Sequence, residues 1–250
     1  AGETWNFMAM TKKLGGETWF KLGDHDLAIH VERTRRLALG ESLSAITSSL
    51  CARLGLRCAI YPMSNDRVRT MVDTDQGELA FQEYFVRRHC EPKVRKLRFE
   101  GVDTASIAPQ FAAALTDAQL EAIVIAPSNP FLSVAPILAL TGVEEHLRQR
   151  KVPAVAISPI VGGKAIKGPA AKILRELGNE VSALSVARHY QGLIDGFVLD
   201  DADAGLSEQV RLLGMRPLVT NTIMSDPEAA TTLAQRVLQF TDTLRAETPR

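Results

Sequence analysis

The sequence has few cysteines, few aromatic residues, no net charge and no long hydrophobic run. Its three cysteines, Cys51, Cys58 and Cys90, are unevenly spaced and form no Cys-x-x-Cys pair. This argues against a structural zinc site and indicates a reduced, cytoplasmic setting. Because the formal net charge is zero, no overall field attracts a nucleic acid or a membrane surface. Apolar runs such as residues 123–126 are far too short to span a bilayer, and no signal peptide is visible.

What the sequence does contain is a sizeable core, with 46% hydrophobic residues in a chain of 250. From about residue 109 onward, short apolar runs alternate with segments of helical periodicity. Near-continuous apolar strands alternating with helices predict an α/β fold, with a Rossmann-like, doubly wound, mostly parallel sheet covered on both faces. The expected strands are residues 122–126, 152–157, 194–199 and 216–220, with a further short strand near 180–183.

The first part of the chain has a different pattern, with three expected helices at residues 5–14, 26–39 and 42–54. We expect one α/β nucleotide-binding domain over residues 1–250, in which 1–56 form a helical cap or insertion and 57–250 form the sheet. The chain opens without Met and with large apolar side chains, as if within a domain. We therefore expect that a preceding segment carries the first strand and phosphate loop of the doubly wound fold.

A glycine-rich stretch follows the expected strand at residues 152–157. It includes Ser158, Pro159, Ile160, Val161, Gly162, Gly163, Lys164, Lys167 and Gly168, and a helix is expected after Pro169. Glycines let the backbone approach an anion closely, and nearby lysines add charge, so the stretch is a candidate phosphate site. Its spacing fits neither of the common phosphate-loop motifs. A flexible strand–helix connection with solvated lysines is an equally good interpretation.

A second candidate, Ser128-Asn129-Pro130, follows the expected strand at residues 122–126. Ligands of open α/β sheets bind at the carboxyl ends of strands, so this loop and the glycine-rich stretch would converge on one pocket if their strands are neighbours. A nucleotide phosphate is the natural occupant. A turn with a helix N-cap explains Ser128 and Asn129 as well as a ligand does.

A third candidate lies near the start of the chain, where Trp19, Phe20, Lys21 and Asp24 combine a stacking surface with a cation and a carboxylate. The competing interpretation is an aromatic anchor with surface charges, and the pattern favours it. An acidic cluster, Asp200, Asp201 and Asp203, follows the strand at 194–199. Such a cluster suits Mg²⁺, but the pattern favours a solvated loop. The five histidines show no metal-ligand spacing.

Taken together, these motifs resemble the 2-phospho-L-lactate transferase family (CofD/FbiA-like). The resemblance rests on four ordered segments and runs from Ala1 to about Met224. The segments are residues 16–30 (GETWFKLGDHDLAIH), 62–66 (PMSND), 127–130 (PSNP) and 158–169 (SPIVGGKAIKGP). Each is weak alone, but their order over this length is specific.

The resemblance implies a transferase of coenzyme F420 biosynthesis. Family members move a phospho-lactyl or phosphoenolpyruvyl group from a GDP-activated donor to the ribityl hydroxyl of 7,8-didemethyl-8-hydroxy-5-deazariboflavin (Fo). GMP is released and Mg²⁺ assists. The expected partners are small-molecule substrates and a second copy in a homodimer, with no nucleic acid or membrane. By resemblance, Trp19, Phe20, Lys21 and Asp24 hold Fo. The donor residues would be Ser128, Asn129, Pro130, Ser158, Pro159, Ile160, Val161, Gly162, Gly163, Lys167 and Gly168.

Two departures from the family pattern bear on this expectation. Family members usually begin with a glycine-rich strand–loop and an Asp-bearing stretch that binds metal and Fo. Neither is in this chain, so we expect the metal-binding Asp outside it and assign no catalytic residue. His25 stands where Arg is usual, and Ile29 where Thr is usual. The alternative function is a non-catalytic nucleotide or sugar-nucleotide binding regulator of the gluconeogenesis-factor type, which the segment at residues 19–26 argues against.

Overall fold

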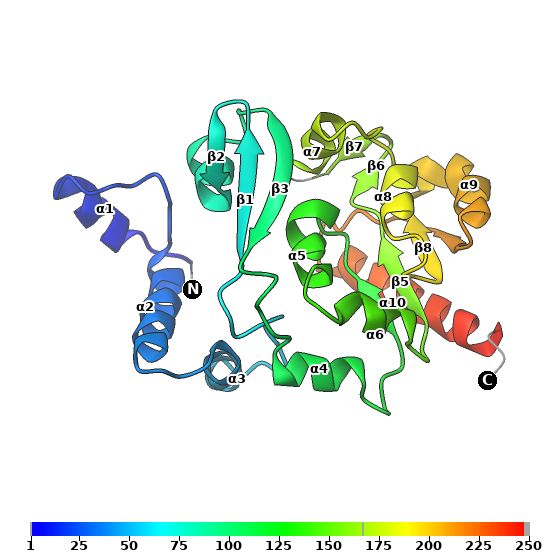
Figure 1. Ribbon diagram of the computed structural model, residues 1–250, viewed down its shortest axis with the longest axis horizontal. Coiled ribbons are helices and arrows are strands. Elements are labelled where there is room, and N and C mark those ends of the chain that lie inside the picture. The colour runs from blue at the N-terminus through cyan, green and yellow to red at the C-terminus, as the bar shows by residue number, and fades with distance from the viewer. Residues whose placement is uncertain (1, 167, 248–250) are drawn as a thin grey trace.

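A parallel sheet forms the centre of the fold (Figure 1). In this computed structural model, which describes residues 2–166 and 168–247, four strands of the described chain pair in the order β4-β5-β8-β9. All three pairings are parallel. The expected α/β, Rossmann-like fold is therefore confirmed. The strands are β4 (Ile123–Ile125), β5 (Ala154–Ile157), β8 (Gly196–Leu199) and β9 (Arg216–Val219).

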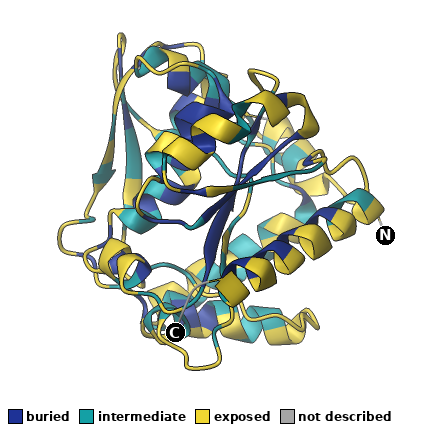
Figure 2. Cartoon of the chain, turned by 90° about the vertical axis from the view of Figure 1, so that its right-hand side faces the viewer, coloured by how far each residue is buried: buried dark blue, intermediate teal, exposed yellow. Residues whose placement is uncertain are grey.

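Alternating side chains of these strands fill two hydrophobic clusters on opposite faces of the sheet. On one face, Val155 and Val198 pack against Val237 and Phe240 of the long helix α10 (Pro227–Glu247). Figure 2 shows α10 lying across this face, with buried residues toward the sheet and exposed residues outward. Every second side chain of the strands thus packs against the apolar face of α10, on which residues recur about every 3.6 positions.

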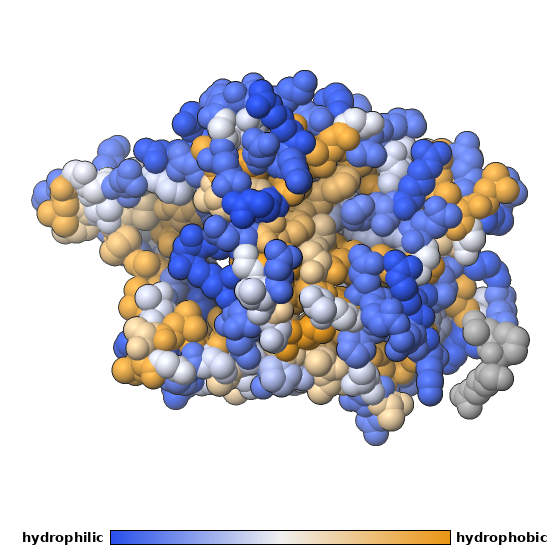
Figure 3. All heavy atoms as spheres, in the orientation of Figure 1, coloured by the Kyte–Doolittle hydropathy of each residue, from blue (hydrophilic) through white to orange (hydrophobic). Residues whose placement is uncertain are grey.

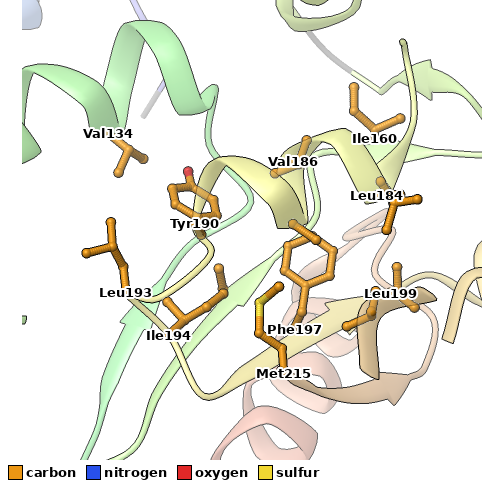
Figure 4. Packing of buried hydrophobic residues seen from close by; sticks show 14 of the residues in the cluster. Val134, Ile160, Leu184, Val186, Tyr190, Leu193, Ile194, Phe197, Leu199 and Met215 are labelled. Carbon is orange, nitrogen blue, oxygen red and sulfur yellow. The ribbon is translucent and has the colours of Figure 1, made fainter. Parts of the chain in front are cut away.

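The opposite face of the sheet carries the larger cluster. Phe197 of β8 is fully buried there beside Tyr190, Ile194 and Met215, as Figure 4 shows. Helices on this side connect successive strands, as expected for a doubly wound sheet. The helices of this half of the chain are α4 (Pro109–Leu115), η2 (Pro130–Val134), α5 (Ala135–Leu138), α6 (Val143–Arg148), α7 (Ala170–Glu176), α8 (Ala183–His189), η3 (Asp201–Leu206) and α9 (Ser207–Leu212).

An antiparallel sheet stands beside the parallel one (Figure 1). Its order is β2-β1-β3, from β1 (Arg69–Thr74), β2 (Gly77–Ala80) and β3 (Val94–Glu100). The π-helix η1 (Glu83–Arg87) connects β2 to β3. Val72, Tyr84 and Val94 form a small core with Ile173 of α7. The antiparallel sheet is therefore docked on the helix that follows the glycine-rich stretch.

Three helices form an arm that projects away from both sheets (Figure 1): α1 (Asn6–Lys13), α2 (Asp24–Ala38) and α3 (Leu43–Arg53). Neither α1 nor α2 has a buried residue. Trp5, Phe7 and Met10 are about half exposed, at 49%, 49% and 53%. Hydrophobic surface is accordingly visible on the arm in Figure 3. A membrane-crossing helix is absent from the described residues.

The side chain of Asp24 ties the start of α1 to the start of α2. Its Oδ2 accepts hydrogen bonds from Thr4 Oγ1 at 2.7 Å and from the backbone N–H of Asn6 at 3.0 Å. Its Oδ1 accepts from the backbone N–H of Phe7 at 3.1 Å. The hydrogen bond from Thr4, followed by that from Phe7, lowers the pKa of Asp24 to about 2. Asp24 therefore supplies the acceptors that α1 lacks at its N-terminus.

We expect Asp24→Ala to release α1 from α2 at neutral pH, because the N–H groups of residues 6 and 7 lose their acceptors. In the parent chain, the lowered pKa makes the tether complete above about pH 4 and weakens it as the pH falls toward about 2. Amide hydrogen exchange of residues 6–10 measures this. Asp26→Ala is the control, since Asp26 is an exposed acid in the same first turn. Equal protection in both variants would contradict the prediction.

One strand expected from the sequence, near residues 180–183, is absent from the structure. Residues 180–182 form no strand, because Ser182 instead caps α8, its Oγ accepting from the N–H of Ser185 at 3.2 Å. The strands expected at 122–126, 152–157, 194–199 and 216–220 are all confirmed, with ends shifted by up to two residues.

Candidate functional site

A cavity of about 180 Å³ lies where the strands of the parallel sheet end. Residues that follow β4, β5 and β9 meet there, so the ends of three strands contribute to the lining of one cavity. This carboxyl edge is where open α/β sheets bind ligands. The described lining residues are Pro127, Asn129, Ser158, Pro159, Val161, Ile166, Gly168, Pro169, Ala170, Thr222, Ile223 and Met224. We call this the strand-end cavity.

Asn129 is a polar residue of the strand-end cavity that has an unused hydrogen-bond donor. Its Oδ1 accepts from the backbone N–H groups of Phe131 at 3.0 Å and Leu132 at 3.2 Å, which caps η2. Its Nδ2 is buried and has no partner among the described residues. Leaving a buried amide donor unpaired costs about 1–3 kcal/mol. The N-cap that the sequence suggested is therefore present, and it leaves the nitrogen free for an acceptor atom of a ligand.

The glycine-rich stretch folds as a hairpin, which the sequence analysis did not anticipate. Residues Ile160–Val161 form β6 and Lys164–Ala165 form β7, paired antiparallel. Gly162 and Gly163 have φ values of +54° and +72°, as a two-residue type I′ turn requires. The Gly162 N–H donates to Asp203 Oδ2 at 2.9 Å, so an anion has no access to that donor. The usable signal was Gly-Gly between two short segments, Ile160-Val161 and Lys164-Ala165.

Two of the three acids that follow β8 are buried, contrary to the expected solvated loop. Asp200 is 6% exposed and Asp203 is 8% exposed, whereas Asp201 is exposed. Asp200 Oδ2 accepts from Thr222 N at 2.8 Å and from Thr222 Oγ1 at 3.0 Å. Burial acts to raise the pKa of Asp200, but hydrogen bonds from Thr222 and Ala202 outweigh it and lower the pKa. The expectation was wrong because it used only local polarity and not these long-range partners.

The strand-end cavity brings together about half of the residues expected to bind the donor. Asn129, Ser158, Pro159, Val161 and Gly168 line it. The Ser158 hydroxyl is already engaged with the backbone of Ile160. Thr222, Ile223 and Met224 were missed, although they follow a strand that was expected. The residues not among its described lining are Ser128, Pro130, Ile160, Gly162 and Gly163, and Lys167 lies outside the described residues.

A larger, open depression of about 500 Å³ adjoins the strand-end cavity. It lies between η1 and the start of α7, and its described lining is Phe85, His89, Cys90, Gly168, Pro169 and Lys172. Gly168 and Pro169 also line the strand-end cavity, so the two hollows share a wall. His89 and Cys90 have left-handed φ values of +49° and +58°. Non-glycine residues in that region are strained, and such strain is concentrated at functional sites.

Of the four residues expected to bind Fo, Trp19 contacts η1. The Trp19 ring meets the Phe20 ring edge-on, with centroids 5.7 Å apart. The Arg87 guanidinium of η1 lies 5.6 Å from the Trp19 ring centroid. Lys21 is exposed, and Asp24 is used to hold α1. None of these four is among the described lining of either hollow. Trp19 therefore contacts the same helix, η1, that contributes Phe85 to the lining of the depression.

Lys172 fastens the wall of the depression to the antiparallel sheet. Its Nζ contacts Glu176 Oε2 at 2.6 Å and donates to the Pro92 carbonyl at 2.8 Å. The same Glu176 oxygen accepts from the N–H of Val94 at 2.9 Å. The two charged side chains are only 30% and 16% exposed. This network therefore holds β3 against α7 across the edge of the depression.

We expect Lys172→Met to lower the free energy of unfolding by about 2 kcal/mol, because it leaves Glu176 partly buried without its cation. Arg148→Met is the matched control. Arg148 also pairs with a glutamate four residues away, but both side chains of that pair are about half exposed, so the loss should stay below about 0.5 kcal/mol. Urea unfolding midpoints give both values. Equal losses in the two variants would show that the Lys172 pair is no more than a surface pair.

The described residues do not supply a metal site of their own. Within residues 2–166 and 168–247, no group of three or more His, Cys, Asp or Glu side chains could hold a metal ion. Asp200 and Asp203, which follow β8, already accept hydrogen bonds from Thr222 and Gly162. The residues present therefore do not fit a bound Mg²⁺, and we derive no step through one.

Comparison with known proteins agrees with the fold and with the sequence motifs. The family model described as 2-phospho-L-lactate transferase CofD matches residues 7–238. A phosphoenolpyruvate transferase of Streptomyces griseus is 39% identical, with 92% of this chain and 74% of that protein aligned. A 2-phospho-L-lactate transferase of Methanosarcina mazei is 38% identical, over 95% of this chain and 77% of that protein.

Among solved structures, protein BH3568 of Bacillus halodurans superimposes with a TM-score of 0.59 over 87% of this chain and 72% of that one. At 14% identity, that likeness shows the shared fold alone. The function rests instead on the two transferases, whose alignments cover 92% and 95% of this chain. The chain therefore belongs to the 2-phospho-L-lactate transferase family and is a transferase of coenzyme F420 biosynthesis.

Proposed function

We propose that the chain transfers a phospho-lactyl or phosphoenolpyruvyl group from a GDP-activated donor to the terminal ribityl hydroxyl of Fo, with release of GMP. The observation that carries the proposal is the unpaired Asn129 Nδ2 in the strand-end cavity. A buried donor without a partner is stabilised by a ligand that brings an acceptor oxygen, and a guanylated acid has many such oxygens.

The donor is too large for the strand-end cavity alone. The cavity's volume of about 180 Å³ is below the ~300 Å³ at which pockets begin to enclose a whole drug-sized ligand. The adjoining depression shares Gly168 and Pro169 with the cavity, so one ligand can extend from the first hollow into the second. This continuity supports a donor that lies across the shared wall, with one end near Asn129.

The acceptor is proposed to approach from the side of the arm. Trp19 and Phe20 offer aromatic surface beside η1, and Phe85 and His89 offer more in the depression. A planar deazaflavin ring is suited to such surfaces, and its hydroxyl chain could then extend toward the shared wall. Residues 1–56 are in this proposal the part that binds the acceptor, with Lys21 free to meet a polar group of Fo.

The reaction forms one bond and breaks one. The ribityl hydroxyl oxygen bonds to the phosphorus that bears the three-carbon acid, and the bond from that phosphorus to the bridging oxygen of the diphosphate breaks. The oxygen leaves with GMP, and the hydroxyl proton passes to solvent. Such a transfer depends on alignment and on stabilising the charge on the phosphoryl oxygens, with no covalent enzyme intermediate needed. Asn129 Nδ2 is the described donor suited to one of those oxygens.

Three further parts of the proposal are not carried by these residues. Mg²⁺ and the homodimer remain predictions from the family resemblance, and the reduced, cytoplasmic setting remains a prediction from the few, unevenly spaced cysteines. The half-exposed apolar side chains of the arm, such as Trp5 and Met10, are compatible with a dimer contact. Sedimentation at several protein concentrations tests the dimer directly.

Titration calorimetry with GDP tests the donor site. We expect a dissociation constant in the micromolar range, which corresponds to about −8 kcal/mol. Incubation with Fo, Mg²⁺ and lactyl- or enolpyruvyl-diphosphoguanosine should then give a phosphodiester product, identified by mass, together with GMP. GDP binding no tighter than AMP binding would refute the guanylated donor. Equal release of GMP with and without Fo would refute transfer to Fo.

A further inference from the structure

The short helix η3 contacts two walls of the strand-end cavity that belong to different parts of the chain. Asp203 accepts the N–H of Gly162 at the tip of the β6–β7 hairpin. Asp200 accepts both the N–H and the hydroxyl of Thr222, in the loop after β9. The N–H of Asp203 in turn donates to the carbonyl of Asp200 at 2.9 Å. The two walls are thereby joined through a single turn of chain.

Both buried carboxylates accept hydrogen bonds. Among the described residues, no cation pairs with Asp200 or Asp203, although both are more than nine-tenths buried. Burying a carboxylate is costly unless its oxygens are hydrogen-bonded. Here the donors are Thr222, which lines the cavity, Ala202, and Gly162, which directly follows the lining residue Val161. If the walls moved, the two buried carboxylates would lose hydrogen bonds, and if the carboxylates were removed, the walls would lose their acceptors.

The hairpin needs such an anchor. Each of its strands has only two residues, and an isolated two-stranded hairpin is marginally stable at best. Ile160 is fully buried in the core and fixes the base of the hairpin. At the tip, Gly162 is exposed and its described anchor is Asp203. Val161, directly before Gly162, lines the cavity, so a shift of the tip moves a cavity wall.

We propose that η3 braces the strand-end cavity and that Asp203 and Asp200 are positioning residues for the guanylated donor. This inference rests on the proposed function. In it, the hairpin glycines do not bind the phosphate themselves. They let the hairpin turn tightly so that the N–H of Gly162 meets Asp203, and the donor contacts the walls that this bond holds in place.

Calorimetry with GDP on the whole chain tests the brace through Asp203→Ala, which removes the acceptor. We expect the affinity for GDP to fall at least tenfold. Asp203→Asn keeps an oxygen in the same place and should bind within about threefold of the parent, which a loss of packing alone would not predict. Asp201→Ala is the matched control, because Asp201 is exposed in the same helix, and should bind as the parent does.

Hydrogen exchange of the Gly162 amide is measured alongside, and should be fast in Asp203→Ala and slow in Asp203→Asn. If the alanine variant does not fold, Asp203→Ser replaces it, since its shorter polar side chain also withdraws the acceptor. Unchanged GDP affinity in a folded variant would overturn the brace and leave the proposed function intact. Equal loss in the alanine and asparagine variants would also overturn it. Absence of GDP binding by the parent chain would overturn both.

Discussion

Replacing Gly196 by alanine is expected to lower the free energy of unfolding by about 3 kcal/mol. Gly196 is in β8, where a Cβ atom would lie 2.5 Å from Phe240 Cε1 and 2.9 Å from Leu244 Cδ1 of α10. Its φ is not positive, so the backbone accepts alanine and only the contact with α10 opposes it. The glycine thus sets how closely α10 approaches the sheet. For a chain of this length the thermal midpoint should fall by roughly 6–12 °C.

Gly205→Ala provides the control for the Gly196 variant. Gly205 also lacks a positive φ, and a Cβ there meets no atom within 4 Å, so its effect should stay within about 0.5 kcal/mol. Phe240→Leu in the Gly196→Ala background should recover part of the loss, because the smaller side chain gives the new methyl group room. Strictly additive losses in that double variant would show that the two residues do not compete for space.

Asn129→Asp is expected to weaken GDP binding about 100-fold while leaving the fold intact. Aspartate keeps the oxygen that caps η2 through Phe131 and Leu132, and it is as good an N-cap as asparagine. It replaces the unpaired Nδ2 with a negatively charged oxygen, which repels an anionic ligand. A 100-fold loss corresponds to about 2.7 kcal/mol, within the range for a lost hydrogen bond to a charged group.

Calorimetry and thermal unfolding of the same samples separate the two roles of Asn129. Asn179→Asp adds the same charge at an exposed residue that does not line the strand-end cavity, and it should leave the affinity unchanged. If Asn129→Asp binds GDP as tightly as the parent chain, the free nitrogen does not contact the donor. If its thermal midpoint falls steeply, the amide nitrogen stabilises the free chain as well.

The Gly196 variant changes packing within the fold, whereas the Asn129 variant changes the binding of a ligand. The Gly196 effect follows from the packing of one helix on one strand and holds whatever the chain binds. The Asn129 effect depends on a ligand, because in the free chain the buried nitrogen has no described partner. A chain that shows the first effect without the second would have the described architecture, but its Asn129 nitrogen would not contact the donor.

Several parts of this architecture could be inferred from local residue patterns. The apolar run before Ser158 predicted β5, and the spacing before Asn129 predicted β4, because a buried parallel strand needs apolar side chains on both faces. Once those strands were neighbours, their carboxyl ends had to meet, so the convergence of Asn129 and Ser158 on one cavity also followed. Those inferences use only short stretches of sequence, within which periodicity and chain direction are encoded.

Other features required partners that are distant along the chain. The bond from Gly162 to Asp203 spans 41 residues, and the network of Lys172 spans 80 residues to Pro92. No local pattern shows that the acids after β8 are buried, or that the glycine pair turns a hairpin toward them. Which of a segment's polar groups remain free for a ligand depends on which are already used, and that is settled only when the segments pack together.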